Sequence, residues 1–284
     1  MSNSFDVVIP AYNTEDTVSE AIASGFAAGA SRVIVVDDGS HDQTSAVART
    51  AGAEVFSKEN AGASIARRFG LAQATADYVI LLDADDALLP KGVGASLSTL
   101  QKDASLVAAG GAAIGRGAQS GQMPIVPAPG RLSLASLLEQ GYSPVPPACI
   151  LWRRVAVTTA ANDGDPAPLR PRYAEDYELL VRGGLIGGLW FHAEPAALYS
   201  LDGGKSTVDP SRSIRASAEI RAYYAEHRRL RINAWGERHV SARVALRQSK
   251  NETGPERLAL IARAARLDPA LIGRVITQRL ARAK

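Results

Sequence analysis

Residues 78–86 read YVILLDADD, an apolar run that is followed directly by three aspartates. The run is too short for a stable helix, so it predicts a buried β-strand. Residues 33–40 read VIVVDDGS and repeat the arrangement with two aspartates. Ligands of an open parallel sheet bind at the carboxyl ends of its strands. The two stretches therefore predict an α/β fold with an acidic site at one edge of the sheet.

The sequence around these stretches alternates short apolar runs with helical patterns. That order is typical of parallel strands joined by crossover helices, and it predicts a Rossmann-like, doubly wound, mostly parallel sheet. Ser40 and Gln43 stand three apart, as in a capping box, which predicts that a helix begins at Asp42. The predicted strands are 5–9, 32–36, 54–57 and 78–82, and the other predicted helices are 18–26 and 63–76.

Beyond Pro90 the pattern loosens. We expect helices at 91–101, 132–140 and 173–186, extended segments at 105–113, 148–157, 189–192 and 196–201, and a Gly- and Pro-rich loop at 115–130. From Ser213 onward the pattern is helical throughout, with breaks at 254–255 and 268–269. Residues 1–205 are therefore predicted to form one domain with halves 1–90 and 91–205, and residues 206–284 a basic helical extension.

The composition narrows the location of the protein. Cys149 is the single cysteine, so an intramolecular disulfide is excluded, and the N-terminus shows no signal-peptide pattern. No apolar run reaches the roughly 18 residues that cross a bilayer. We expect a cytoplasmic protein, at most peripheral on the inner face of the membrane, with no nucleic-acid partner.

Charge is distributed unevenly along the chain. Residues 211–284 carry 17 Lys and Arg against 6 Asp and Glu, a net charge of +11, whereas residues 1–210 carry 15 against 23, a net charge of −8. The basic extension suits an anionic lipid surface or a phosphate-bearing acceptor. It suits a solvated helix face or a homodimer contact equally well, so these interpretations stay open.

The aspartates behind the two strands need a compensating partner. A carboxylate after an apolar strand is expensive to bury unless a cation or hydrogen-bond donors meet it. Mg²⁺ and Mn²⁺ are typically held by one or two carboxylates, with substrate phosphates supplying further oxygens. Asp, Gly and Ser also form turns and helix caps, so either cluster alone would indicate a turn. Two clusters on strands of one half-sheet favour a metal site.

Four blocks stand in order within the first 90 residues: VVIPAYN at 7–13, VDDGS at 36–40, NAG at 60–62 with AR at 66–67, and LDADD at 82–86. Together they resemble the signature of glycosyltransferase family 2. The resemblance implies a GT-A fold and an inverting glycosyltransferase that uses a nucleoside-diphosphate sugar, most often a UDP-sugar, with Mn²⁺ or Mg²⁺. Residues 1–90 would bind the nucleotide and 91–205 the acceptor, which is a glycan, a lipid-linked glycan or a small molecule.

The resemblance also implies a role for each matched position. It assigns donor binding to Pro10, Ala11, Tyr12, Glu15, Asp37, Asp38, Arg67 and Asp83. Within the acid-x-acid motif, Asp83 would face the ribose or sugar and Asp85 would bind the metal, with Asp83 as a further ligand. Taken alone, Tyr12 would be an ordinary half-buried aromatic and Arg67 a surface helix charge.

The acceptor hydroxyl must lose its proton as it attacks the anomeric carbon, which requires a general base. Residues 173–182, YAEDYELLVR, resemble the family's Glu-Asp motif, and this resemblance assigns Asp176 as the base. The competing interpretation is that Asp176 caps the start of a helix. Direct displacement from the opposite face of the sugar predicts inversion.

The segment after the last predicted strand departs from the family pattern. In LYSLDGGKST at 198–207, Asp202 stands where many relatives have His, so a further metal ligand is left open. Asp202 could serve, and Lys205 or Ser206 could contact the diphosphate; an exposed Gly-rich loop is the alternative. The four histidines show no ligand spacing and are expected to be structural or exposed.

Three rival functions remain for comparison. A sugar nucleotidyltransferase would carry a Gly-rich, Arg-containing loop where this chain has PAYN at 10–13, and a dinucleotide-dependent oxidoreductase would carry G-x-G-x-x-G there. A catalytically idle binding module would be free to lose Asp85 and Asp176, yet both are present.

Overall fold

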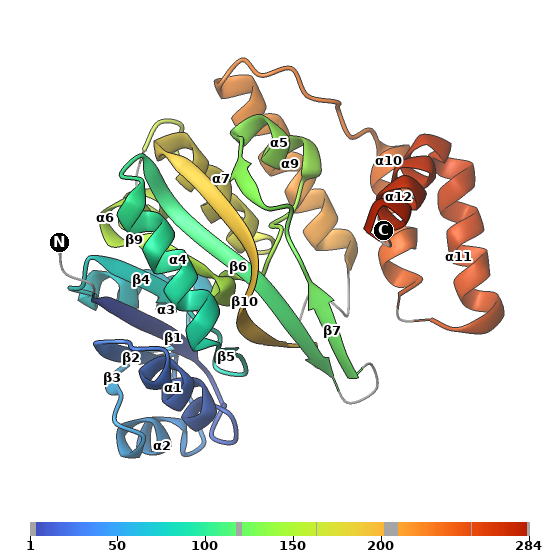
Figure 1. Cartoon of the computed structure of the whole chain (residues 1–284). Helices are drawn as coiled ribbons and strands as arrows, with labels where there is room; N and C mark the ends of the chain where they lie inside the picture. The colour runs from blue at the N-terminus through green and yellow to red at the C-terminus, as the bar shows by residue number, and fades with distance from the viewer. Residues whose placement is uncertain (1–3, 118–120, 163, 202–209, 251, 283–284) are drawn as a thin grey trace.

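The structure is a computed structural model that describes residues 4–117, 121–162, 164–201, 210–250 and 252–282. A ten-stranded sheet carries helices on both faces and is followed by helices α9–α12 (Figure 1). The strands are β1 (Phe5–Ala11), β2 (Arg32–Asp37), β3 (Glu54–Ser57), β4 (Tyr78–Leu81), β5 (Ala87–Leu88), β6 (Leu106–Gly117), β7 (Gly121–Ile125), β8 (Gly130–Leu132), β9 (Ile150–Arg153) and β10 (Gly188–Ser200). The helices are α1 (Val18–Ala27), α2 (Thr44–Thr50), α3 (Ala63–Gln73), α4 (Pro90–Lys102), α5 (Leu134–Gln140), η1 (Pro147–Cys149), α6 (Arg154–Asn162), α7 (Glu175–Ile186), α9 (Pro210–His227), α10 (Glu237–Gln248), α11 (Gly254–Leu267) and α12 (Pro269–Arg282).

The strand order is β3-β2-β1-β4-β9-β6-β10-β5, with β7 paired to β6 and β8 to β10. Strands β1 to β4 run parallel to one another. Strand β9 lies between β4 and β6 and is antiparallel to both, and β10 is parallel to β6. Because β1 lies between β2 and β4, the carboxyl ends of these three strands meet at one edge of the sheet. The predicted parallel half-sheet is confirmed.

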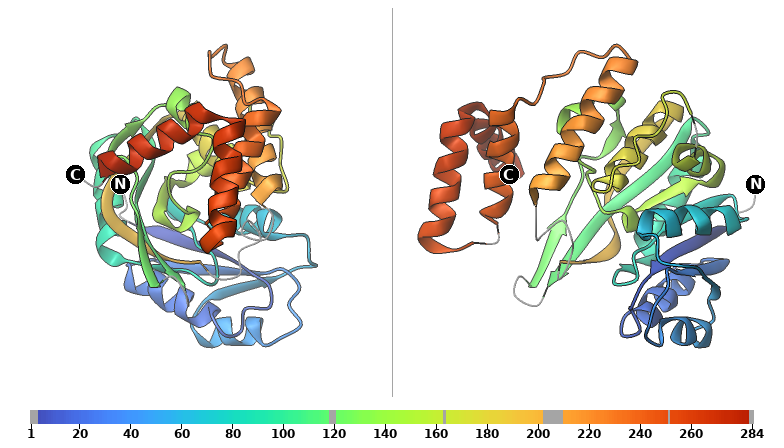
Figure 2. Two further views of the ribbon diagram at one scale, coloured as in Figure 1. Left: turned by 90° about the vertical axis from the view of Figure 1, so that its right-hand side faces the viewer. Right: turned by 180° about the vertical axis from the view of Figure 1, so that it is seen from behind.

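Helices cover both faces of the sheet and shield its apolar side chains. Helices α1 and α4 lie on one face, and α3, α6 and α7 on the other (Figures 1 and 2). The side chains of Val7, Ile9 and Ile34 are fully buried, as expected for strands that are covered on both faces.

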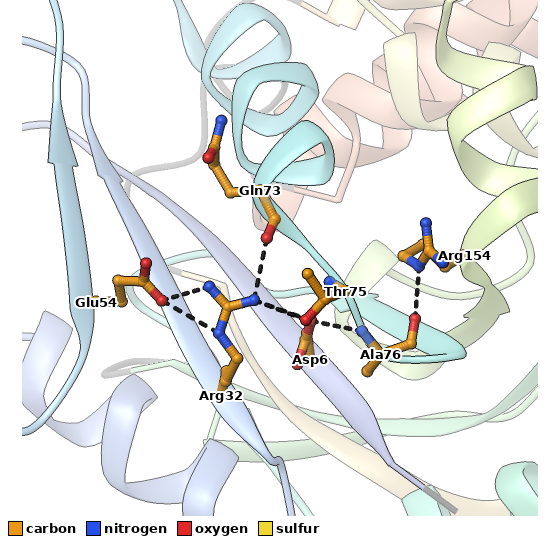
Figure 3. Close-up of polar contacts among 7 residues, drawn as sticks. All are labelled: Asp6, Arg32, Glu54, Gln73, Thr75, Ala76 and Arg154. Atoms are coloured by element: carbon orange, nitrogen blue, oxygen red, sulfur yellow. Dashed lines mark hydrogen bonds and ion pairs between the residues drawn. The ribbon is translucent and has the colours of Figure 1, made fainter. Parts of the chain in front are cut away.

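The amino ends of the parallel strands are closed by a polar network around the buried Asp6 (Figure 3). Asp6 Oδ2 accepts hydrogen bonds from the backbone N–H groups of Thr75 and Ala76 at 2.7 and 3.0 Å. Arg32 Nη1 lies 3.8 Å from the same oxygen, and the guanidinium also pairs with Glu54. The network fixes the turn that leads into β4, and thereby the height at which β4 ends on the opposite edge.

The predicted capping box is wrong. Helix α2 begins at Thr44, and Gln43 precedes it without a side-chain cap. Ser40 Oγ instead accepts from the N–H of Asn13 at 2.9 Å, and Asp42 Oδ1 accepts from the N–H of Thr44 at 2.9 Å. These contacts bind the loop after β2 to the loop after β1, which a local pattern could not show.

Two expectations for the second half of the domain are also corrected. The predicted loop at 115–130 contains β7, which forms an antiparallel hairpin with β6. The segment 148–157 is extended only over β9 (Ile150–Arg153), which lies between the 3-10 helix η1 and α6. Arg153 is paired with Tyr78, the first residue of β4, so a longer strand would have no partner there.

The basic extension is not continuously helical. Helix α9 ends at His227, and residues 228–236 are not helical. Arg229 adopts the left-handed conformation at φ 51°, and the N–H of Leu230 donates to the carbonyl of Ala225 at 2.8 Å. This is a Schellman-type end with arginine in the place where glycine is usual, so the sequence carried no signal for it.

The extension takes part in two separate hydrophobic clusters. Ile220, Tyr224 and Ala225 of α9 belong to the main core, whereas α10–α12 form a small cluster around Ala242 and Ala264. The boundary at residue 205 stays a prediction. Among the helices that the structure describes, none combines the length and apolar character that a bilayer-spanning segment requires.

Candidate active site

The turn after β4 is held in place by backbone hydrogen bonds. The N–H of Leu82 donates to the carbonyl of Val8 at 3.0 Å, and the N–H of Asp86 donates to the carbonyl of Asp83 at 3.1 Å. Asp86 is buried, and its Oδ1 accepts from the N–H of Ser200 at 2.8 Å. The acidic turn is therefore anchored at both ends, to β1 and to β10.

The carboxylates of this turn are crowded. Burial raises the pKa of Asp86 to about 8; the charges of Asp83 and Asp85 add to this effect, and the hydrogen bond from Ser200 opposes it. Asp86 Oδ2 is buried without a hydrogen-bond partner. The pKa of exposed Asp85 is also raised, first by partial desolvation and then by the charge of Asp83, although Arg116 opposes the shift. The turn therefore brings together carboxylates that disfavour one another's ionised forms.

Arg67 of α3 joins the turn to the start of α7. Its Nη2 lies 2.6 Å from Asp83 Oδ1, and its Nη1 lies 3.3 Å from Glu175 Oε1. Burial alone would lower the pKa of Arg67, but the charges of Asp83, Glu175 and Asp176 raise it well above its ordinary value. Arg67 is therefore an internal counter-ion and not a surface helix charge.

Asp176 lies in the first turn of α7, where the helix dipole favours an anion. Burial is the main cause that raises the pKa of its carboxyl group, and the charge of Asp83 adds to it. The backbone N–H of Tyr177 and the guanidinium of Arg67 oppose the shift. A carboxylate whose proton affinity is raised in this way is a better general base than a free aspartate.

The structure brings four predicted residues, Arg67, Asp83, Asp85 and Asp176, into one charged cluster at the carboxyl edge of the sheet. Two neighbours without a predicted role, Glu175 and Asp86, belong to the same cluster. Both stand next to a predicted residue in the sequence, but their part in the site depends on contacts with α3 and β10 that no motif records.

Asp37 and Asp38 reach the same edge of the sheet through β2, but their carboxylates are occupied by protein donors. Asp37 Oδ1 accepts from the N–H of Ser40 at 2.9 Å, and its other oxygen accepts from the hydroxyl of Ser45. Asp37 therefore acts as a turn residue, and its contact with the donor stays a prediction.

Asp38 is 3% exposed and organises the loop that precedes α3. It accepts from Lys58 Nζ at 2.6 Å, from the N–H of Ala61 at 3.0 Å and from the N–H of Gly62 at 2.7 Å. These bonds outweigh the opposing effect of burial and lower its pKa. Asp38 shapes the wall of the proposed nucleotide site, whether or not it contacts a base.

The remaining donor-side residues lie in the loop after β1. Pro10 and Ala11 are buried at the end of the strand, whereas Tyr12 is 45% exposed. Glu15 Oε2 accepts from the N–H of Gln43 at 2.8 Å and so fastens this loop to the one after β2. His41 lies edge-on to Tyr12 with ring centroids 6.4 Å apart, which places a second ring beside the predicted base pocket.

Asp202, Lys205 and Ser206 lie outside the described residues, so their proposed contacts with metal and diphosphate stay predictions. Within the described part of the chain, no group of three or more His, Cys, Asp or Glu side chains is arranged to hold a metal ion by itself. Asp83 and Asp85 supply hard oxygen ligands for Mg²⁺ or Mn²⁺, which commonly take one or two carboxylates and complete their shell with phosphate and water. The crowded carboxylates of the turn fit this mode of binding.

The sequence profile of glycosyl transferase family 2 matches residues 6–157, which is more than half of the chain. The chain belongs to glycosyl transferase family 2. The matched region includes the acidic turn and Arg67 but ends before Asp176.

Relatives of this family 2 chain match it over about a third of its length. The succinoglycan biosynthesis protein ExoU of Rhizobium meliloti (strain 1021) is 37% identical over 99 residues, which are 32% of this chain and 29% of that protein. The uncharacterized glycosyltransferase YibD of Escherichia coli (strain K12) is 33% identical over 96 residues, 31% of this chain and 28% of that protein. The matched segment thus spans less than a third of either relative.

Solved structures of glycosyltransferases share the fold of this family 2 chain over nearly its whole length. Residues 1–349 of Staphylococcus aureus TarS in complex with UDP-GlcNAc superpose with a TM-score of 0.61 at 17% identity, covering 92% of this chain and 79% of that one. The mannosyltransferase PcManGT from Pyrobaculum calidifontis, in complex with GDP-Man and Mn²⁺, gives 0.57 at 14% identity, covering 98% and 80%. The predicted GT-A fold is confirmed.

Proposed function

We propose that this protein transfers a sugar from a nucleoside-diphosphate donor, most simply a UDP-sugar, to an acceptor hydroxyl with inversion at the anomeric carbon. The observation that carries the proposal is the single charged cluster of Asp83, Asp85 and Asp176 around Arg67. A direct displacement requires a metal-binding pair and a general base within one site, and the proximity of these charged side chains supports that assignment.

The protein's own residues divide the work between the two halves of the domain. Asp83 and Asp85 would hold a divalent cation, which when bound offsets negative charge on the diphosphate leaving group. Tyr12 and the loop ordered by Asp38 would receive the nucleotide. Asp176 would accept the proton of the acceptor hydroxyl, and its raised pKa keeps proton transfer near neutral pH favourable.

Arg67 would keep Asp176 ionised and ready to act. Its charge opposes the protonation that burial and Asp83 favour. Because Arg67 also pairs with Glu175 in the first turn of α7, it orients the helix that carries the base.

Donor identity and location are part of the proposal. TarS was solved with UDP-GlcNAc and PcManGT with GDP-Man, so a uracil or a guanine base would suit this fold. We favour UDP, a glycan, lipid-linked or small-molecule acceptor, and a cytoplasmic location.

Two aspartate substitutions test the proposal. Asp85→Asn should abolish the thermal stabilisation that UDP with Mn²⁺ gives the protein, because the metal loses a ligand. Asp176→Asn should keep that stabilisation and lose transfer by roughly 10²–10⁴-fold, because only the proton acceptor is removed. The measurements are thermal unfolding with and without UDP and Mn²⁺, and nucleotide release from a panel of UDP-, GDP- and dTDP-sugars.

Asp77→Asn is the matched control, since Asp77 is an exposed carboxylate at the opposite end of β4. It should leave both measurements unchanged. A protein that is not stabilised by any nucleotide with Mn²⁺ would instead be an idle binding module, and an Asp85→Asn variant with full turnover would end the metal assignment.

A further inference from the structure

A polar cavity lies outside the proposed active site, between α9, α10 and α11, and has a volume of about 100 Å³. Its polar lining consists of Ser211, Arg215, Ser241, Gln248 and Arg263, and two apolar residues of α10 complete it. A water molecule takes about 30 Å³, so the cavity accommodates a tetrahedral anion.

Every polar side chain in this lining can donate a hydrogen bond, and no carboxylate among the described residues lines the cavity. Arg263 forms neither a side-chain hydrogen bond nor an ion pair with any residue that the structure describes. Arg215 Nη1 contacts Glu237 Oε1 at 2.7 Å, outside the cavity lining. Arg215 and Arg263 both line this cavity and are exposed to solvent, and guanidinium groups are well suited to bind the oxygens of a phosphate group.

Two residues that neighbour the cavity lining in the sequence interact with residues near the proposed active site. Ser211 precedes Arg212, whose Nη1 donates to Tyr173 Oη at 3.0 Å, and Tyr173 stands three residues before Asp176. Arg212, in the first turn of α9, thus links a helix that lines the cavity to the segment that precedes α7.

The second connection passes through α10. Gln248 follows Arg247, whose positive charge acts on Tyr199 near the end of β10. Burial raises the pKa of Tyr199 to about 12, the charges of Asp86, Asp83 and Asp176 raise it as well, and Arg247 opposes them. Arg247 and the acidic cluster therefore both act on Tyr199, with opposite effects on its pKa.

We propose that the cavity between α9, α10 and α11 binds a phosphate group carried by the acceptor. The inference rests on the proposed transferase function and names its acceptor class, a phosphate-bearing hydroxyl compound. The anion would hold the acceptor on the positively charged extension, while its hydroxyl reaches Asp176 in the negatively charged domain.

Direct binding of phosphate tests the site without any turnover. Inorganic phosphate and glycerol 1-phosphate should each bind the full chain saturably in isothermal titration, in EDTA and without nucleotide, so that the donor site does not contribute. Arg263→Gln should weaken binding by about tenfold, because one charge-assisted contact is lost. Arg257→Gln, which removes the same charge from an exposed position of α11 outside the cavity, should have no effect.

Glu237 supplies a test in the opposite direction. It competes with the anion for Arg215, so Glu237→Gln should tighten phosphate binding by a few-fold. Absence of saturable binding, or equal losses in Arg263→Gln and Arg257→Gln, would overturn the proposal.

An experiment with lipid vesicles distinguishes two sources of the phosphate group, a lipid head group and a soluble acceptor. Pelleting with phosphatidylglycerol vesicles that Arg263→Gln abolishes would assign the group to a lipid head group. Binding of glycerol 1-phosphate without pelleting would assign it to a soluble acceptor. UDP with Mn²⁺ should stabilise Arg263→Gln as it does the unaltered chain, so a failure of the phosphate site is separable from a failure of the donor site.

Discussion

Arg67 is the side chain through which the donor and acceptor sides of the proposed site influence each other. It contacts Asp83 at 2.6 Å and Glu175 at 3.3 Å, and its charge holds down the pKa of Asp176. Its role is therefore electrostatic as well as structural, and both aspects can be measured on one substitution.

Arg67→Gln should lower kcat/KM by at least about tenfold, the effect of losing charged hydrogen bonds. The pKa of Asp176 would rise further, and a base works only when deprotonated, so the acid limb of the pH–rate profile should move to higher pH. Arg68→Gln on the same helix is the control, because Arg68 forms no side-chain hydrogen bond or ion pair with the acidic residues that the structure describes. An unchanged acid limb in Arg67→Gln would show that Asp176 is not the titrating base.

Asp38 gives a stability prediction at the same scale. Its pKa is lowered in the folded protein, where bonds from Lys58, Ala61 and Gly62 outweigh burial. Its contribution is therefore fully present above the ordinary pKa of 3.8 and is lost as the pH falls through the folded value.

Asp38→Asn should lower the free energy of unfolding by about 2 kcal/mol at pH 7, since a charged acceptor of several bonds is lost. The difference from the unaltered protein should shrink below about pH 4, where Asp38 itself becomes protonated. Urea unfolding from pH 7 to pH 3 measures this, with exposed Asp16→Asn as the control. A deficit that stays constant over this range would contradict the assigned linkage.

The residues that the sequence located correctly are those whose signal is local. Asp83 and Asp85 directly follow a buried strand, so their place at the sheet edge followed from the strand alone. Glu175 was only the neighbour of Asp176 in the sequence, because its partner Arg67 is 108 positions away. The roles of Asp37 and Asp38 as turn and loop anchors likewise depend on donors from separate segments.

Among the elements, α4 packs unusually closely on the sheet. A Cβ atom at Gly92 would lie 2.1 Å from the carbonyl oxygen of Pro195 in β10, and 2.5 Å from Ala196 Cα. Both neighbours are backbone atoms, so α4 could only respond by moving away from the sheet. Gly94 lies on the exposed face of α4, and a Cβ atom added there would have nothing within 4 Å.

Gly92→Ala should therefore destabilise the protein by about 1–3 kcal/mol, the usual range for an overpacked core. Gly94→Ala should stabilise it by up to about 1 kcal/mol, because alanine is the better helix former. Urea unfolding of both variants measures the contrast. Equal effects of the two substitutions would mean that α4 does not approach β10 as closely as the structure shows.

Helices and strands could be predicted from the sequence where a local pattern determines them, but not where a distant contact determines their ends. Strands β1, β2 and β4 are largely apolar runs because helices cover both faces, and each was found. The short, partly exposed edge strand β3 was found as well. The change from β9 to α6 at Arg154 depends on where β4 begins, and the end of α9 depends on a left-handed Arg229. Neither leaves a mark in the local pattern.

At the scale of the whole molecule, α9 belongs with the sheet domain although it stands in the basic extension. Tyr224 of α9 donates from its hydroxyl to the buried Glu178 at 2.6 Å. Glu178 also accepts from the N–H groups of Leu169 and Arg170, at 2.6 and 3.0 Å. The helix thus fastens the loop that leads to α7 and Asp176.

Helices α10–α12 are attached differently. Trp235, in the segment before α10, lies between two guanidinium groups, Arg221 of α9 at 4.1 Å and Arg243 of α10 at 3.8 Å. Their own cluster is small and separate from the main core. This arrangement predicts that the chain can be shortened after Trp235 but not before α9.

A chain of residues 1–236 should fold cooperatively and keep its stabilisation by UDP with Mn²⁺, because it keeps every residue of the main core. It loses the contacts of α10, among them the Arg215–Glu237 ion pair and the stacking of Arg243 on Trp235, which contributes about 0.5–2 kcal/mol. A chain of residues 1–209 lacks Ile220, Tyr224 and Ala225 and leaves the buried Glu178 short of a donor, so it should lose cooperative unfolding. The end of the 1–209 chain lies close to the predicted boundary at residue 205, and the end of the 1–236 chain lies just beyond the last residues of the main core. Thermal unfolding followed by circular dichroism, with and without UDP and Mn²⁺, decides between them: cooperative, nucleotide-stabilised unfolding of residues 1–209 would assign α9 to the extension.

Because the 1–236 chain lacks α10 and α11, it should also bind no inorganic phosphate while its donor site stays intact, which would place acceptor capture and sugar donation in separable parts of the molecule.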